Sequence, residues 1–156
     1  MSLRNFIITI ALLCVTTSFS NGITIGSKFE VLYEEISYSN LYKEILKSEL
    51  KFPEVVFAQA LLESGHFSSE VFKSENNLFG MKYPRQRTTT SLKKGKTGYA
   101  NYIHWSSSVH DYKLWQSNMI SNSDGMNREQ YLKLLGRVYA EDKKYILKLK
   151  SIITKV

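Results

Sequence analysis

One acidic residue of this sequence stands where a carboxyl group could do acid–base chemistry. Glu63 directly follows the most apolar stretch after residue 20, which is VVFAQALL at 55–62, and Ser64-Gly65 comes next. Apolar surroundings disfavour the charged form of a carboxyl and raise its pKa, as a general acid that works near neutral pH requires. The alternative is an ordinary carboxylate on the exposed side of a helix end, and the residue type alone leaves both open.

Residue types that serve other chemistries are sparse. His66, His104 and His110 are too few and too scattered for a metal site. The single Cys14 excludes a disulfide scaffold and a Cys-based zinc finger, because each needs at least two thiols. We therefore expect no metal and no cofactor.

An ordered set of motifs surrounds Glu63. The string AQALLESG occupies 58–65, NLFGMK follows at 77–82, GYANY at 98–102, and YAEDKKY at 139–145. Together they resemble the glucosaminidase family of peptidoglycan hydrolases, the mannosyl-glycoprotein endo-β-N-acetylglucosaminidase-like domains of glycoside hydrolase family 73 within the lysozyme-like superfamily. The resemblance extends over about residues 50–155, and the ordered set is more specific than any one motif.

The resemblance implies a lysozyme-like α+β fold with a mainly helical body and a small β-hairpin lobe. It also implies an endo-β-N-acetylglucosaminidase that cleaves the β-1,4 bond between N-acetylglucosamine and the next N-acetylmuramic acid of peptidoglycan. Glu63 matches the family's catalytic acid, which protonates the leaving glycosidic oxygen. Tyr102 matches an aromatic residue near that acid, either an assisting hydrogen-bond group or a wall of the groove.

Five further residues are candidate substrate contacts. Aromatic rings can stack on sugars, but they also fill protein cores, and Phe79 is favoured as a packing residue. An amide side chain such as that of Asn77 could hydrogen-bond to a sugar. The candidate substrate-binding residues are Asn77, Phe79, Tyr83, Tyr99 and Trp105.

A second catalytic carboxylate is harder to find. Glycosidases commonly use two, yet no Asp or Glu occurs between Glu75 and Asp111, the interval that contains the predicted lobe. One interpretation is substrate assistance, in which the 2-acetamido group of the sugar acts as the internal nucleophile. The other is that a distant acid, Glu70, Glu75 or Asp111, approaches in space. Asp111 has a simpler explanation, because a helix dipole favours a carboxylate in the first turn.

Helices must position most of these residues. Apolar spacing and capping signals predict a mainly helical domain over 41–156, with the β-lobe at about 78–105. Pro53 suits the first turn of a buried helix, and the sequence from Asn127 to Gln130 has the form of a capping box. The predicted helices are one after residue 40, one from Pro53 to about Leu62, a short one near 71–73, one from Ser106–Ser108 to Met119, one after Asn127, and one over about 141–153.

The pattern of the first residues indicates a targeting segment. A short cationic start, the apolar run from Phe6 to Val15 and the small residues Ser18 and Ser20 predict a signal peptide over 1–20, followed by a lead-in over 21–40. An uncleaved N-terminal anchor and lipidation at Cys14 are the alternatives. We expect an exported protein of the periplasm, cell envelope or extracellular space, which would contact a membrane only through an uncleaved signal.

The charge balance leaves several partners open. The 156 residues include 21 Lys+Arg and 14 Asp+Glu, a formal charge of +7. No nucleic-acid-binding motif accompanies this charge, so we expect no nucleic-acid partner, and a basic lobe also suits the anionic cell wall. We expect a monomer that acts on peptidoglycan glycan strands. Two alternatives remain: a lytic transglycosylase using a single Glu, and a catalytically inactive wall-binding protein.

Overall fold

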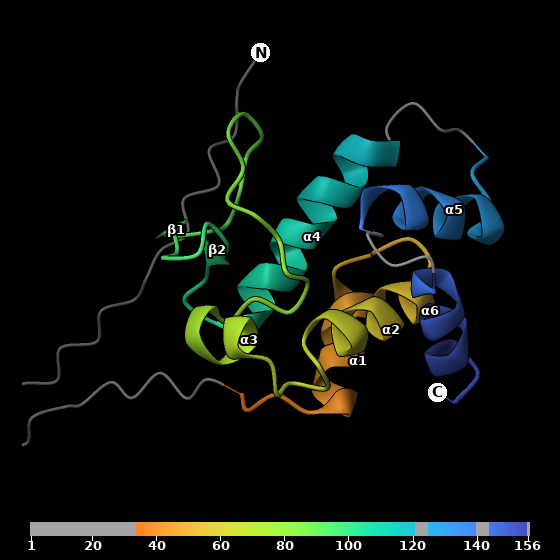
Figure 1. The fold of residues 1–156 in the computed structure, drawn as a ribbon, viewed down its shortest axis with the longest axis horizontal. Helices are drawn as coiled ribbons and strands as arrows, with labels where there is room; N and C mark the ends of the chain where they lie inside the picture. Colours follow the sequence, from red (N-terminus) through yellow and green to blue (C-terminus); the bar gives the residue numbers. More distant parts are fainter. Residues whose placement is uncertain (1–33, 121–124, 140–143, 156) are drawn as a thin grey trace, which may run out of the picture. The chain divides into compact units, whose positions relative to one another are not determined.

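The computed structural model describes residues 34–120, 125–139 and 144–155 (Figure 1). The predicted signal peptide, most of the lead-in and the predicted helix start at residue 141 lie outside the described residues. Within the described parts of the chain, no helix is both long and apolar enough to cross a membrane.

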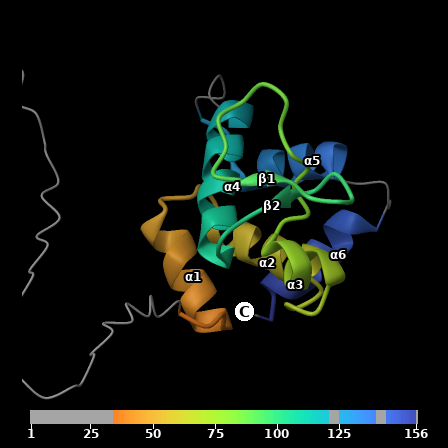
Figure 2. The ribbon, with the colours of Figure 1, turned by 90° about the vertical axis from the view of Figure 1, so that its left-hand side faces the viewer.

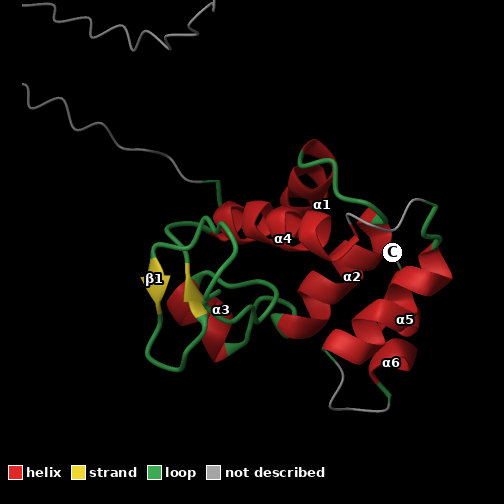
Figure 3. Cartoon of the chain, turned by 90° about the horizontal axis from the view of Figure 1, so that it is seen from above, coloured by secondary structure: helices red, strands yellow, loops and turns green. Residues whose placement is uncertain are grey.

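Five helices make the body of the domain. The most buried is α2, which contacts both α1 and α6. In Figure 3, α4 runs from the side of the short strands toward the other helices, and α5 and α6 lie at the opposite end from β1. The bounds are α1 Tyr38–Lys47, α2 Pro53–Glu63, α4 Trp105–Ile120, α5 Arg128–Val138 and α6 Tyr145–Ile153.

The helix α2 forms as its sequence predicts. Pro53 occupies the first turn, where its missing N–H costs no hydrogen bond. Every residue from Val55 to Leu61 is buried, so this helix is surrounded by protein on most sides. Ser64 ends it, and Gly65 follows with a positive φ of 56°. The carboxyl of Glu63 therefore lies at the C-terminal end of a buried helix.

The lobe contains the short helix α3, Glu70–Glu75, and two short strands, β1 Lys93–Lys94 and β2 Ala100–Asn101 (Figure 2). The strands pair antiparallel, with Lys93 opposite Asn101 and Lys94 opposite Ala100. An isolated bridge pairs Lys82 with Tyr99. The predicted α+β class, a mainly helical body with a small β-hairpin lobe, is confirmed.

Two boundary predictions need correction. The long helix begins at Trp105 rather than at Ser106–Ser108, so Trp105, the last residue of the predicted β-lobe, belongs to the helical body. Asp111 therefore lies in the second turn of α4, so the helix dipole of a first turn does not explain its carboxylate. The capping box is confirmed, because Asn127 and Gln130 exchange both hydrogen bonds at the start of α5.

Candidate active site

Glu63 is half-buried at the C-terminal end of α2. The hydroxyl of Tyr145, the first residue of α6, donates a hydrogen bond to Glu63 Oε1 at 2.9 Å. Burial raises the pKa of the Glu63 carboxyl, and the hydrogen bond from Tyr145 offsets part of that rise. The group is thus held in one orientation and retains its proton at higher pH than an exposed glutamate.

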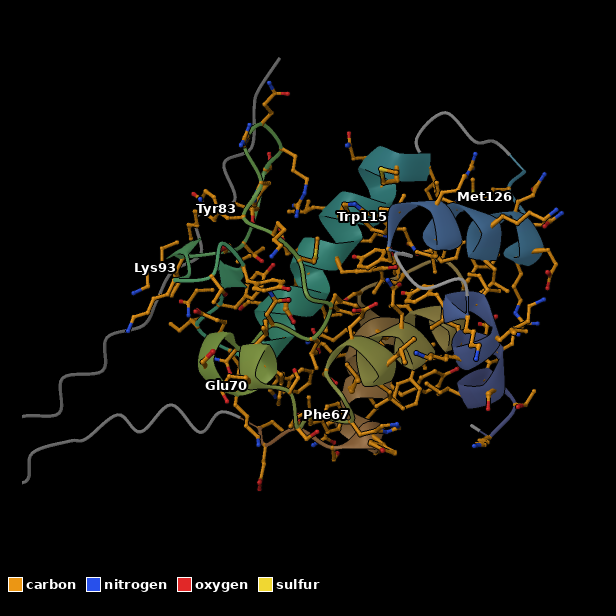
Figure 4. All side chains as sticks on the ribbon, in the orientation of Figure 1. Phe67, Glu70, Tyr83, Lys93, Trp115 and Met126 are labelled. Carbon is orange, nitrogen blue, oxygen red and sulfur yellow. The ribbon has the colours of Figure 1, made fainter. Side chains whose placement is uncertain are left out.

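A groove opens beside this carboxyl, with a volume of about 450 Å³. The helical body supplies Glu63 and Trp115, and the lobe supplies Tyr83. Figure 4 shows Trp115 on α4 and Tyr83 on the lobe. Aromatic rings, which suit the apolar faces of sugars, make up much of the lining. The lining residues are Glu63, Gly80, Met81, Lys82, Tyr83, Pro84, Arg87, Tyr99, Trp115, Val138 and Tyr139.

The lobe approaches Glu63 through a glycine. Gly80 has a φ of +60°, and a Cβ on it would lie 3.7 Å from Glu63 Oε2 and 4.0 Å from Tyr99. The positive φ favours glycine at this turn. The carboxyl of Glu63 and the ring of Tyr99 therefore border the same small space.

Three aromatic residues line up from α4 to the acid. Trp115 meets Tyr139 edge to face at 5.6 Å, and Tyr139 stacks on Tyr145 at 6.3 Å between ring centroids. Burial, with a further contribution from the charge of Glu63, raises the pKa of the Tyr139 hydroxyl. These rings form an apolar wall that helps keep water from the Glu63 carboxyl.

A second carboxylate, Asp111 on α4, is hydrogen-bonded to side chains of the lobe. Arg87 donates to both of its oxygens, at 2.7 and 2.8 Å, and Tyr102 donates its hydroxyl proton to Asp111 Oδ2 at 2.7 Å. Burial works to raise the pKa of Asp111, but the hydrogen bonds from Arg87 and Tyr102 outweigh it and lower the pKa. Asp111 is fully buried, and the guanidinium of Arg87 compensates its negative charge.

Comparison with known proteins identifies the family of this site. The model of the glucosaminidase family, described as mannosyl-glycoprotein endo-beta-N-acetylglucosaminidase, matches residues 39–156. The chain belongs to the glucosaminidase family. It is by family a glycosidase, and no match was found among curated proteins.

A solved structure has a similar fold. The catalytic domain of the autolysin Auto from Listeria monocytogenes matches with a TM-score of 0.54 and 22% sequence identity. The match covers 80% of this chain and 88% of that chain. At this identity the likeness shows a shared fold.

The predicted substrate contacts divide into two groups. Tyr83 and Tyr99 line the groove with Glu63. Phe79 is fully buried and stacks on Tyr112 at 4.2 Å, and Trp105 is buried and donates its indole N–H to the Glu34 carbonyl. These two rings lie in the core, away from the groove lining.

Asn77 and Tyr102 are also buried, and their polar groups are used within the protein. The Asn77 amide donates to the carbonyls of Met81 and Ala100, and its Oδ1 accepts from the Met81 N–H. The Tyr102 hydroxyl is bonded to Asp111. Their roles at the substrate stay predictions. The Tyr102 bond ties the lobe to α4 of the body, whereas the Asn77 bonds lie within the lobe.

The other acids proposed for a second step lie elsewhere. Glu70 and Glu75 line a different cavity, beside the strand residues Lys93 and Lys94. Among the described residues that line the Glu63 groove, Glu63 is the sole acid. No cluster of three His, Cys, Asp or Glu able to hold a metal ion occurs in the described part of the chain.

Two residues of the site were not singled out from the sequence. Tyr145 enters the sequence analysis only as the last residue of the YAEDKKY motif, yet its hydroxyl contacts Glu63. Arg87 is one of the cations of the basic lobe, and the structure shows that it anchors the lobe to Asp111. The pattern YAEDKKY at 139–145 could have directed attention to Tyr145, whereas no local signal marks Arg87.

Proposed function

We propose that this glucosaminidase-family protein is a peptidoglycan hydrolase that cleaves the β-1,4 bond between N-acetylglucosamine and the next N-acetylmuramic acid. The single observation that carries this proposal is the Glu63 carboxyl, half-buried in an aromatic-lined groove and oriented by Tyr145. Family membership and the similarity to the catalytic domain of an autolysin add support.

Glu63 acts as the general acid. Its raised pKa lets it keep its proton at higher pH than an ordinary glutamate, and transfer of that proton to the glycosidic oxygen lets the leaving sugar depart as an alcohol. Tyr145 holds Oε1, so it acts as a positioning residue for the carboxyl.

The second half of the reaction is substrate-assisted in this proposal. The acetamido oxygen attacks the anomeric carbon as the glycosidic bond breaks, and water then opens the cyclic intermediate with Glu63 as base. Two observations support this course: Glu63 is the sole acid among the described lining residues, and Asp111 is bound by Arg87 and Tyr102. Tyr102 then acts on the site through Asp111, as a positioning residue.

The cellular setting follows from the substrate. A wall hydrolase must reach the glycan. The proposal therefore includes export through the predicted signal peptide and a location in the cell envelope or outside the cell. It also includes action as a monomer. Peptidoglycan strands are the partner, and neither a cofactor nor nucleic acid is required.

The substitution Glu63→Gln tests the acid. Loss of a general acid lowers kcat by about 10²- to 10⁴-fold, measured as release of soluble fragments from purified cell walls. Glu70→Gln, at an exposed acid outside the groove, is the matched control and should keep full activity.

Product analysis separates the alternatives. Fragments ending in reducing N-acetylglucosamine are expected, whereas 1,6-anhydromuramic ends would assign the chain to the lytic transglycosylases, which need no second carboxylate. A wild-type protein that binds several types of wall without releasing fragments would establish the inactive wall-binding alternative.

A further inference from the structure

We infer that Lys82 is a specificity-determining residue that binds a carboxylate on the sugar beside the scissile bond. The substrate class would then be a glycan whose sugars carry carboxylates through a lactyl or lactyl-peptide substituent, in preference to a neutral polymer of N-acetylglucosamine. This inference rests on the proposed function, because it concerns the same groove.

The backbone brings Lys82 to the groove. It follows the Gly80 turn that approaches Glu63, and its bridge to Tyr99 places it across from that ring. The Lys82 ammonium lies 3.3 Å from the centroid of the Tyr99 ring, within the range of a cation–π contact. Because Tyr99 borders the same space as the Glu63 carboxyl, the ammonium is held near the position of a bound sugar.

The charge of Lys82 is not compensated by an acid. Among the described residues, no carboxylate oxygen lies within 4.0 Å of the Lys82 ammonium. The other cation lining the groove, Arg87, is paired with Asp111 through two hydrogen bonds. Glu63 adds no charge in the protonated form that a general acid needs. In that form the described lining of the groove therefore presents one uncompensated positive charge.

A carboxylate is the ligand group that best fits this arrangement. A lysine ammonium forms charge-assisted hydrogen bonds with carboxylates, and such bonds gain strength beside an apolar surface such as the Tyr99 ring. A neutral sugar offers only hydroxyl and amide oxygens. Lys82 would therefore add affinity for carboxylated strands and little for a neutral one.

The test compares kcat/KM of the wild type with that of Lys82→Met and Lys82→Arg. Methionine keeps an unbranched apolar stem on Tyr99 and removes the charge, whereas arginine keeps the charge. Four strands serve as substrates: peptide-bearing glycan, peptide-stripped glycan with free lactyl carboxylates, and each of these with its carboxylates amidated. Lys93→Met is the control, because Lys93 is exposed on β1 beside a different cavity.

We expect Lys82→Met to lower kcat/KM on carboxylated strands by about 10- to 100-fold, with most activity retained in Lys82→Arg. On amidated strands the wild type and Lys82→Met should be equal. A loss confined to peptide-stripped strands assigns the lactyl carboxylate, and a loss confined to peptide-bearing strands assigns a peptide carboxylate. An equal loss on carboxylated and amidated strands, or no loss at all, overturns the inference.

Binding measurements in a Glu63→Gln background separate this inference from the proposed hydrolysis. There, Lys82→Met should weaken the Kd for a carboxylated fragment and leave that for its amidated form unchanged. If the wild type hydrolyses nothing but this difference in Kd persists, the hydrolytic function fails and the Lys82 site stands. If the wild type hydrolyses the strands and both Kd values stay unchanged, the Lys82 site fails alone.

Discussion

The two walls of the groove are held in place by different kinds of interaction. On the body side, α2 is buried over Val55–Leu61 within the apolar core. On the other side, none of residues 82–99, the outer lobe, is buried. The outer lobe is instead attached by polar contacts, chiefly Arg87 to Asp111 and Thr90 Oγ1 to the Ser107 carbonyl. A rigid acid thus faces a wall whose position depends on a few hydrogen bonds.

The two carboxylates show what this difference means for chemistry. Glu63 is half-buried, has Tyr145 as its side-chain donor and has a raised pKa. Asp111 is fully buried but receives hydrogen bonds from Arg87 and Tyr102, and its pKa is lowered. The hydrogen-bond donors around a carboxyl, and not only how deeply it is buried, decide which acid keeps its proton. The poorly satisfied acid suits catalysis, and the well satisfied one suits anchoring.

Breaking the Arg87–Asp111 ion pair, which anchors the lobe, should have the largest effect on stability. Arg87→Met leaves the buried Asp111 without its ionic partner, so we expect the free energy of unfolding to fall by about 3–5 kcal/mol, measured by urea denaturation. Since the folded pKa of Asp111 is lowered, the stability it contributes is present above its unfolded pKa of about 4 and is lost as the pH falls further. Arg85→Met, at an exposed lobe cation, is the control, and an equal loss there would refute the anchor.

Loss of the hydrogen bonds that Asn77 makes within the lobe should have the next largest effect. Asn77→Ala removes two donors and one acceptor from buried carbonyl and N–H groups of Met81 and Ala100. We expect a loss of about 1–3 kcal/mol, with faster amide hydrogen exchange in the lobe than in α2. Gln86→Ala, at an exposed lobe residue, should change neither quantity. Uniformly faster exchange in body and lobe would remove the distinction between them.

A smaller effect is expected on the body side at Tyr145. The hydrogen bond from Tyr145 lowers the pKa of Glu63, so Tyr145→Phe should raise that pKa further and move the alkaline limb of the kcat/KM profile to higher pH. The lost orientation should also lower kcat by about fivefold, corresponding to a hydrogen bond of about 1 kcal/mol. Tyr38→Phe, which removes a hydroxyl bonded to His66, is the control. An alkaline limb that moves to lower pH would contradict this role.

The smallest expected change is a gain in stability. Because the folded pKa of Glu63 is raised, folding favours its protonated form, and that contribution is present at low pH and is lost as the pH rises through the folded pKa. Glu63→Gln mimics the protonated form, so at pH 7 it should be more stable than the wild type by about 0.5–1 kcal/mol. The difference should vanish near pH 4, as followed by thermal unfolding. A less stable variant at pH 7 would show that the charged carboxylate is well accommodated.

Local signals were enough for several elements. Pro53 and the apolar run after it fixed the course of α2, and Asn127 with Gln130 fixed the start of α5, because each depends on residues within one or two helical turns. The start of α4 was misplaced because three successive serines can each serve as an N-cap, and the sequence does not choose among them. Glu63 stood out because an acid within an apolar string is unusual wherever the chain folds.

By itself the sequence determined the family, the α+β class and the prominence of Glu63, since ordered motifs and short-range periodicity carry them. Only the tertiary structure decided which groups surround that acid. Tyr145 reaches Glu63 from 82 positions along the chain, and Arg87 reaches Asp111 from 24. Such contacts depend on how helices and lobe pack, and packing brings together residues whose spacing in the sequence has no fixed period. Among the described residues, the same packing gave Glu63 one side-chain donor, Tyr145, and gave Asp111 several, which set their pKa values in opposite directions.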